Sequence, residues 1–182
     1  MLRKNEKDFL QAAISGDFNH VKAQLDAEIN IELFDQKTGS RALMYAATNG
    51  HLNIVKLLID KGADINATNH FNRSALSYAC IMGQEDIAMY LTAKGANLNQ
   101  NDQYNNSLLM LCSHMGLCQF GQKLIDHGLQ LDQINHSQKT ALLMAQDAKQ
   151  PHFMTLLQNA ENTALQTLRK SVGQKLSLRR RR

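Results

Sequence analysis

The stretch GSRALMYAATNGHLNIVKLLIDKGADINATN, residues 39–69, decides the fold, because its features return along the chain every 33 residues. Three markers keep this period. They are the apolar pairs that begin at Ala42, Ala75, Leu108 and Ala141, the glycines Gly50, Gly83 and Gly116, and the glycines Gly62, Gly95 and Gly128. A fixed period of this length is typical of a solenoid, in which each unit buries its apolar face only against its neighbours.

Within one period, the residues predict two short helices. Residues 42–49 are small and apolar, which suits a helix packed tightly against a neighbour, and Gly50 follows where a helix end favours a left-handed residue. Residues 52–59 place apolar side chains on one helical face. Gly62 ends this second helix, and the Asn- and Asp-rich residues after it predict a turn.

One turn position of each unit holds a residue that tolerates a positive φ. Gly39, Asn72 and Asn105 occupy it in the first three units. Gln138 breaks the pattern in the fourth unit. The pattern therefore predicts the same turn in the first three hairpins and leaves the fourth open.

The unit resembles the ankyrin repeat. The matching parts are Gly50-His51, the IVKLLI run at 54–59 and KGADIN at 61–66, with weaker copies at 94–99 and 127–132. The resemblance covers roughly residues 5–160 and implies an all-α repeat solenoid, in which helix-turn-helix units are stacked and joined by short hairpin loops, with a helix at the C-terminus.

The chain departs from the family pattern at the start of the first helix of each unit. The family's proline is replaced by Ala42, Ala75, Leu108 and Ala141, and its histidine by Met44, Ser77, Met110 and Leu143. Because polar groups that tie neighbouring repeats together in the family are lost, we expect a more apolar and less stable seam between repeats.

The same register divides the chain into a repeat domain, 1–160, and a C-terminal amphipathic helix with a basic tail, 161–182. The domain consists of a capping repeat at 5–35 and repeats at 36–68, 69–101, 102–134 and 135–160. In the cap, Ala12 and Gly16 precede their counterparts by 34 residues, so one extra residue is expected near 34–37. Pro151 suits the first turn of a helix at 152–159.

The charge of the chain is unevenly distributed. The formal net charge is +4, but residues 1–168 carry 13 basic and 16 acidic side chains. The tail carries seven basic side chains: Arg169, Lys170, Lys175, Arg179, Arg180, Arg181 and Arg182. Helically spaced apolar residues interleave with them, at Ala164, Leu165, Leu168, Val172 and Leu176. This helix either caps the last repeat or binds a partner, nucleic acid, anionic lipid or a nuclear import receptor.

Residues that could carry chemistry fall on packing positions. Cys112 aligns with Ala46, Ala79 and Ala145, and no further ligands accompany Cys112, His114 and Cys118. We therefore expect no metal, no cofactor, no small-molecule substrate and no catalysis. Three cysteines without a secretion segment indicate an intracellular protein, cytoplasmic or nuclear. Divergent Met-rich repeats also resemble those of bacterial proteins, including ones delivered into host cells.

In ankyrin proteins, hairpin tips and the exposed sides of the first helices form a concave surface that binds partner proteins. Carried over by register, the candidate residues are Tyr45, Thr48, Asn49, His70, Phe71, Arg73, Tyr78, Ile81, Met82, Tyr104, His114 and Met115. The equivalents in the fourth repeat are His136, Ser137, Lys139, Asp147 and Ala148. Ile81 and Met82 could equally pack onto neighbouring repeats. Asn66 and Asn99 resemble asparagines that are hydroxylated in many family members.

These observations predict a non-catalytic module that binds a partner protein through the concave face, as an adaptor, scaffold or inhibitor. The alternative is that the basic tail drives binding to nucleic acid, to an anionic membrane or to the import machinery, as in a bacterial effector acting in a host cell. The repeats would then be a scaffold.

Overall fold

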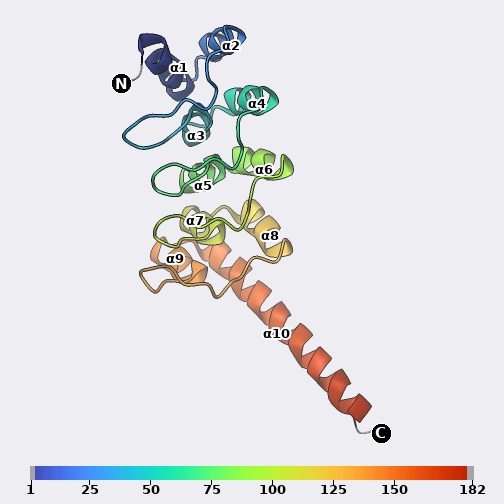
Figure 1. The fold of residues 1–182 in the computed structure, drawn as a ribbon. Coiled ribbons are helices and arrows are strands. Elements are labelled where there is room, and N and C mark those ends of the chain that lie inside the picture. The colour runs from blue at the N-terminus through green and yellow to red at the C-terminus, as the bar shows by residue number, and fades with distance from the viewer. Residues whose placement is uncertain (1–2, 180–182) are drawn as a thin grey trace.

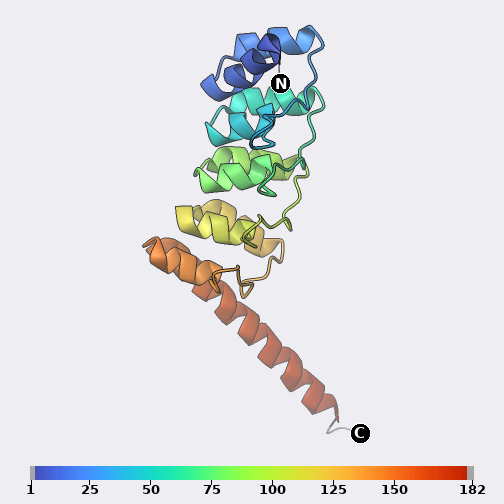
Figure 2. The same cartoon turned by 60° about the vertical axis from the view of Figure 1, so that its left-hand side comes forward.

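The computed structural model describes residues 3–179, without the side chains of Leu168 and of residues 171–179. Helices lie in antiparallel pairs, and the pairs stack one on the next into an elongated solenoid, which both views show (Figures 1 and 2). The pairs are α1 (Lys4–Ser15) with α2 (Phe18–Asp26), α3 (Ala42–Thr48) with α4 (Leu52–Asp60), α5 (Ala75–Ile81) with α6 (Glu85–Ala93), α7 (Leu108–Met115) with α8 (Cys118–Asp126), and α9 (Ala141–Asp147) with the start of α10 (Pro151–Arg179). This confirms the predicted all-α repeat solenoid.

The core consists of columns of side chains that recur with the period of the sequence. One column of the second helices holds Ile54, Ile87, Phe120 and Phe153, all at most 2% exposed. A second holds Leu58, Leu91, Leu124 and Leu157, at most 1% exposed. Between the first helices, small residues allow close approach, and Cys112 is as fully buried as Ala46, Ala79 and Ala145. The packing role predicted for this cysteine is confirmed.

The hairpins between helix pairs share one closing hydrogen bond. In the second hairpin, the N–H of Asn69 donates to the carbonyl of Arg73, four residues later. In the first, the N–H of Asp35 donates to the carbonyl of Ser40, five residues later. The extra residue predicted near 34–37 therefore lies inside the first hairpin.

Left-handed positions are occupied even where glycine and asparagine are missing. Gln138 has a φ of 58°, close to the 55° of Asn72, and Lys149 has a φ of 54° at the position of Gly50 and Gly116. The fourth hairpin, which the sequence pattern left open, therefore closes as the others do. Each such residue costs about 1–2 kcal/mol, which the packed repeat must offset.

Polar side chains also tie neighbouring repeats together across the seam. Asn69 Nδ2 donates to Ser40 Oγ at 3.0 Å, and Asn135 Nδ2 donates to Asn106 Oδ1 at 2.7 Å. His51 Nε2 lies 3.0 Å from the carbonyl of Ile14 in the capping repeat. Met44 and Met110 are buried at the positions of the family histidine, as expected, and polar ties at other positions still join neighbouring repeats.

Helix α10 is continuous where the sequence predicted two separate helices. Its first turns supply Phe153 and Leu157 to the core columns, so it begins as the second helix of the last repeat. The earlier second helices end before Gly62, Gly95 and Gly128, which have φ values from 79° to 90°. Glu161 stands at the equivalent position. Because the left-handed terminator is missing, the helix runs on to Arg179.

Beyond its first turns, α10 leaves the stack and projects away from it (Figures 1 and 2). Leu165 is 53% exposed, and Arg169 and Lys170 are exposed as well. This described part of the helix does not cap the last repeat, so that alternative is corrected. The side chains of Lys175 and Arg179, and residues Arg180, Arg181 and Arg182, lie outside the described part.

A test of the packing between α8 and α10 is available at Gly121. A Cβ atom at this residue would lie 2.5 Å from two ring carbons of Phe153. We expect Gly121→Ala to lower the free energy of unfolding by about 1–3 kcal/mol, through overpacking that outweighs the gain of about 1 kcal/mol in helix propensity. Urea unfolding measures it.

The control is the double variant Gly121→Ala/Phe153→Leu, in which the smaller side chain relieves the clash. The two changes should then be non-additive, with the double variant more stable than the sum of the single effects predicts. A chain that is stabilised by Gly121→Ala alone would show that the ring does not pack there.

Candidate protein-interaction surface

The hairpin tips and the outer sides of the first helices follow one another along one side of the stack, as Figure 1 shows for α3, α5, α7 and α9. Apolar side chains on this side are exposed in the second and third repeats. Phe71 is 36% exposed, Met82 48%, Tyr104 51% and Met115 38%. The stack therefore brings together the apolar residues that the register selected, at positions where they meet solvent.

The tips of the second, third and fourth hairpins are each held by a buried residue at the base of the hairpin. Asp102 Oδ1 accepts hydrogen bonds from the N–H groups of Tyr104 and Asn106, at 2.9 and 3.0 Å. Asn69 and Asn135 make the equivalent pairs of bonds in the neighbouring hairpins. These bonds fix the backbone direction at the tip, and with it the direction in which Tyr104 leaves the surface.

Successive tips are also tied to one another. The N–H of His70 donates to the carbonyl of Thr38, and the N–H of Gln103 to that of Phe71. The N–H of His136 continues the series to the carbonyl of Tyr104. Consecutive tips therefore lie at a fixed separation, so the surface is rigid before any partner arrives.

An ion pair links the second and third tips. Arg73 Nη2 lies 2.9 Å from Asp102 Oδ2, and the Asp102 side chain is fully buried. Burial raises the pKa of the Asp102 carboxyl, but hydrogen bonds from Asn106, Arg73 and Tyr104 outweigh it, so its pKa lies below the ordinary value. The guanidinium carbon of Arg73 is also 6.0 Å from the centre of the Tyr104 ring. Arg73 thus contacts both the Asp102 carboxylate and the ring of Tyr104.

A groove of about 320 Å³ lies between the third and fourth repeats on this side. The ion pair of Lys139 with Asp147, with Nζ and Oδ2 2.5 Å apart, belongs to its wall. The groove is lined by Tyr104, Asn106, His114, Asn135, Ser137, Lys139, Met144 and Asp147. The groove is thus lined by an aromatic ring, a thioether, an imidazole, and one basic and one acidic side chain.

Other predicted residues are committed to local contacts. Tyr78 is half-buried, and its hydroxyl accepts a 2.7 Å hydrogen bond from Asn69. Tyr45 is half-buried with its hydroxyl 3.4 Å from Thr38 Oγ1. Ile81 packs against the core, whereas Met82 does not. Thr48 and exposed Asn49 donate to carbonyls of their own helix.

His70 is exposed, and its ring lies against the first hairpin, with Nδ1 3.3 Å from the carbonyl of Lys37. His114 is exposed at the end of α7 and lines the groove. The exposed part of the predicted surface therefore centres on repeats 69–101 and 102–134 and continues into the fourth repeat.

The buried residues at the hairpin bases were missed by the sequence reasoning. Their signal was present: Asn69, Asp102 and Asn135 recur every 33 residues, and Asp35 precedes Asn69 by 34. A side-chain oxygen two residues before a tip N–H is the pattern of an Asx turn.

Asn66 and Asn99 lie in the loops that lead from the second helices, α4 and α6, to the next hairpin tip, and both are exposed. Asn66 Oδ1 accepts a 2.8 Å hydrogen bond from the N–H of Asn97 in the next repeat. Its structural role is thus to join consecutive loops. Hydroxylation of either residue stays a prediction.

Two features are absent from the described residues. No group of three or more His, Cys, Asp or Glu side chains is placed to hold a metal ion there. Nor does any helix within that part of the chain combine the length and apolar character needed to cross a bilayer.

Comparison with known proteins gives the family. The family model for ankyrin repeats, three copies, matches residues 9–102, just over half of the chain. The chain belongs to the ankyrin repeat family. No curated protein matches it. Ankyrin repeats are in general protein–protein interaction modules.

The ion pair beneath Tyr104 gives a pH-dependent prediction. Because the Asp102 pKa is lowered by folding, the ionised group stabilises the fold above its ordinary pKa of 3.8, and this contribution is lost as the pH falls towards the lower pKa of the folded state. Asp102→Asn, which keeps an Asx turn, should lower the free energy of unfolding at pH 7 by about 1–3 kcal/mol, since Arg73 loses its charged partner.

Urea unfolding of both proteins between pH 3 and pH 7 measures this difference. It should shrink as the pH falls, because protonation removes the same charge from the native protein. A difference that stays constant over this range would show that the charge of Asp102 contributes nothing.

Proposed function

We propose that this ankyrin protein is a non-catalytic interaction module that binds a partner protein through the hairpin side of its second to fourth repeats, as an adaptor, scaffold or inhibitor. The single observation that carries the proposal is the exposure of Phe71, Met82, Tyr104 and Met115 along one side of a rigid stack. Aromatic residues and arginine dominate the centres of protein interfaces, and methionine adapts to irregular partner surfaces.

Pre-organisation supports the same proposal. The tips are held by backbone hydrogen bonds between consecutive hairpins and by buried Asx side chains, so little conformational entropy would be lost on binding. The ring of Tyr104 lies next to the guanidinium of Arg73, which is held in place by its ion pair with Asp102, so the position of the ring is restricted. A partner could then insert an apolar side chain between Tyr104 and the groove beside His114.

We expect the double variant Phe71→Ala/Tyr104→Ala to lose capture of the partner from the native cell by at least about 30-fold, since two interface anchors contribute about 1 kcal/mol or more each. Quantitative mass spectrometry of proteins retained on the immobilised full chain measures the loss. Circular dichroism and melting should be unchanged, because both side chains are exposed.

The matched control is Phe34→Ala. Phe34 is an aromatic of similar exposure, 44%, and lies beside Arg41 at the first hairpin, away from the groove. Retention of the same proteins by wild type, control and double variant alike would refute the proposed surface.

A second candidate function rests on α10. The helix projects beyond the stack with Arg169 and Lys170 exposed, in a tail of seven basic residues and no acidic one. Under this alternative, the tail binds nucleic acid, an anionic membrane or an import receptor, and the repeats serve as scaffold. Binding of nucleic acid would then fall steeply with salt, because each neutralised phosphate releases a counterion.

Removal of residues 169–182 separates the two candidates. We expect the shortened chain to retain the partner captured by the full chain at 150 mM salt, because Phe71, Tyr104 and the groove are untouched. Loss of capture on shortening, with a steep salt dependence in the full chain, would instead assign the binding to the tail.

A further inference from the structure

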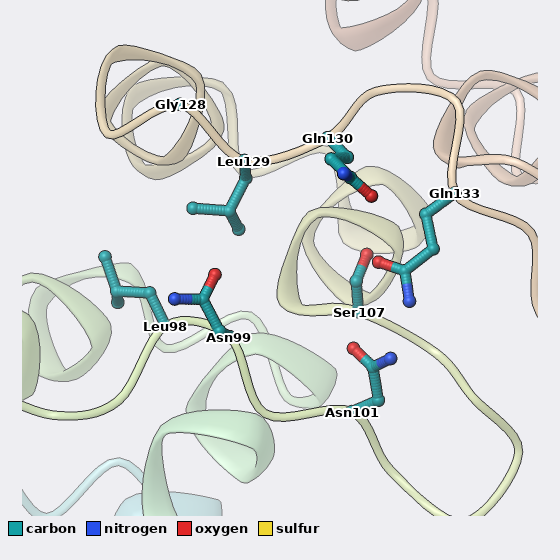
Figure 3. Close-up of a pocket in the computed structure, with 8 residues that line it drawn as sticks. All are labelled: Leu98, Asn99, Asn101, Ser107, Gly128, Leu129, Gln130 and Gln133. Carbon is teal, nitrogen blue, oxygen red and sulfur yellow. The ribbon is translucent and has the colours of Figure 1, made fainter.

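A cleft of about 430 Å³ opens at the seam between the second and third repeats, on the loops that follow the second helices. Leu98 and Leu129 face one another at one end, and Asn101, Ser107 and Gln133 surround the other end (Figure 3). The complete lining is Leu98, Asn99, Asn101, Ser107, Gly128, Leu129, Gln130 and Gln133.

The same place in the first seam is filled. There the space is only about 10 Å³. Arg41 occupies it and donates from Nη1 to the carbonyl of Thr68 at 3.0 Å, while its Nε lies 2.9 Å from Glu32 Oε2. Glu32 Oε1 also accepts a 2.8 Å hydrogen bond from the N–H of Asp64, which joins consecutive loops.

The seam between repeats 69–101 and 102–134 is the third, counted from the capping repeat. It lacks both side chains that close the first seam. Two repeats later, Ser107 stands at the position of Arg41 and Asn99 at that of Glu32. Gln130 takes the place of Asp64, whose N–H is bonded across the first seam. Among the described residues, no hydrogen bond joins Asn99 to Gln130, although the intermediate seam still has the bond from Asn97 to Asn66. Among these three seams, all within the described residues, the hydrogen bond between the loops of consecutive repeats is therefore missing only at the seam that contains the cleft.

The chemistry of the lining defines its complement. Four carboxamides line the cleft, from Asn99, Asn101, Gln130 and Gln133, and no ionisable side chain does. A carboxamide offers one acceptor and a donor in one plane, which matches the N–H and C=O of a peptide group. The leucine pair adds an apolar end. A charged ligand would meet no countercharge here, and a purely hydroxylic one would leave the leucine end unmatched.

We propose that this cleft binds an extended, uncharged peptide segment. The segment places a small aliphatic side chain between Leu98 and Leu129, and its backbone amides pair with the carboxamides of Asn99, Gln130 and Gln133. The volume lies within the usual range of ligand sites, about 300–1,000 Å³. The cleft shares no lining residue with the groove beside Tyr104, so it is independent of the interaction surface proposed above.

The test is a titration of the ¹⁵N-labelled full chain with a blocked, neutral peptide, acetyl-Ala-Val-Asn-Ala-amide, followed by NMR. We expect saturable shifts at the N–H of Gln130 and at the carboxamide of Asn99. Asn99→Leu and Gln133→Leu should each weaken binding about fivefold or more, as expected for a lost hydrogen bond. Gln119→Leu, the same chemical change at an exposed residue of α8 outside the cleft, should bind as the wild type does.

A second variant closes the cleft with the pair from the first seam. Ser107→Arg/Asn99→Glu should fold, because Arg41 and Glu32 already occupy this position in the same chain, and it should no longer bind the peptide. Retained binding by this variant would overturn the proposal. So would shifts that do not saturate, or equal shifts with maltose, which would assign the cleft to hydroxylic ligands. Neither outcome bears on capture through Phe71 and Tyr104.

Discussion

A buried Asx side chain at the base of the second, third and fourth hairpins is the constraint on which the rest of the molecule depends. Its oxygen accepts N–H groups from the tip, as Asp102 does from Tyr104 and Asn106. Because these backbone groups are pulled away from water, an unpaired one would cost about 1–3 kcal/mol. Closing the hairpin in one register then allows the next N–H to bond the previous tip, as Gln103 does to Phe71. Stacking and surface geometry follow from this local turn.

The features that distinguish this chain arise where one repeat differs from the others at a single position. Glu161 replaces a terminating glycine, and the last helix runs out of the stack. Ser107 stands where Arg41 fills the first seam, the bond between consecutive loops is missing there among the described residues, and a cleft lies at this place. Solenoids tolerate such changes because each unit contacts only its neighbours, so a local loss stays local. The core columns of α4, α6, α8 and α10 remain intact throughout.

The 33-residue period predicted most of the fold, since apolar columns and helix-ending glycines are signals that each repeat carries within itself. It also placed Phe71 and Tyr104 at exposed tips, because the register transfers position directly. It could not predict the polar ties across seams, such as Asn69 to Ser40, because these depend on two repeats meeting at a given distance. The continuous α10 was predictable in principle, since Glu161 stands where three glycines precede it.

Exposure on the candidate surface was less predictable than position. Ile81 and Met82 are adjacent, yet Ile81 packs on the core and Met82 faces solvent. Successive residues at the end of α5 point in different directions, so position in the repeat alone does not give exposure.

The central claim is that a partner covers the hairpin side of repeats two to four. Hydrogen exchange of the full chain, free and bound to its captured partner, tests this most directly. The account predicts added protection at residues 69–73, 102–106 and 135–139 and at the ends of α5 and α7; protection confined to α10 would contradict it.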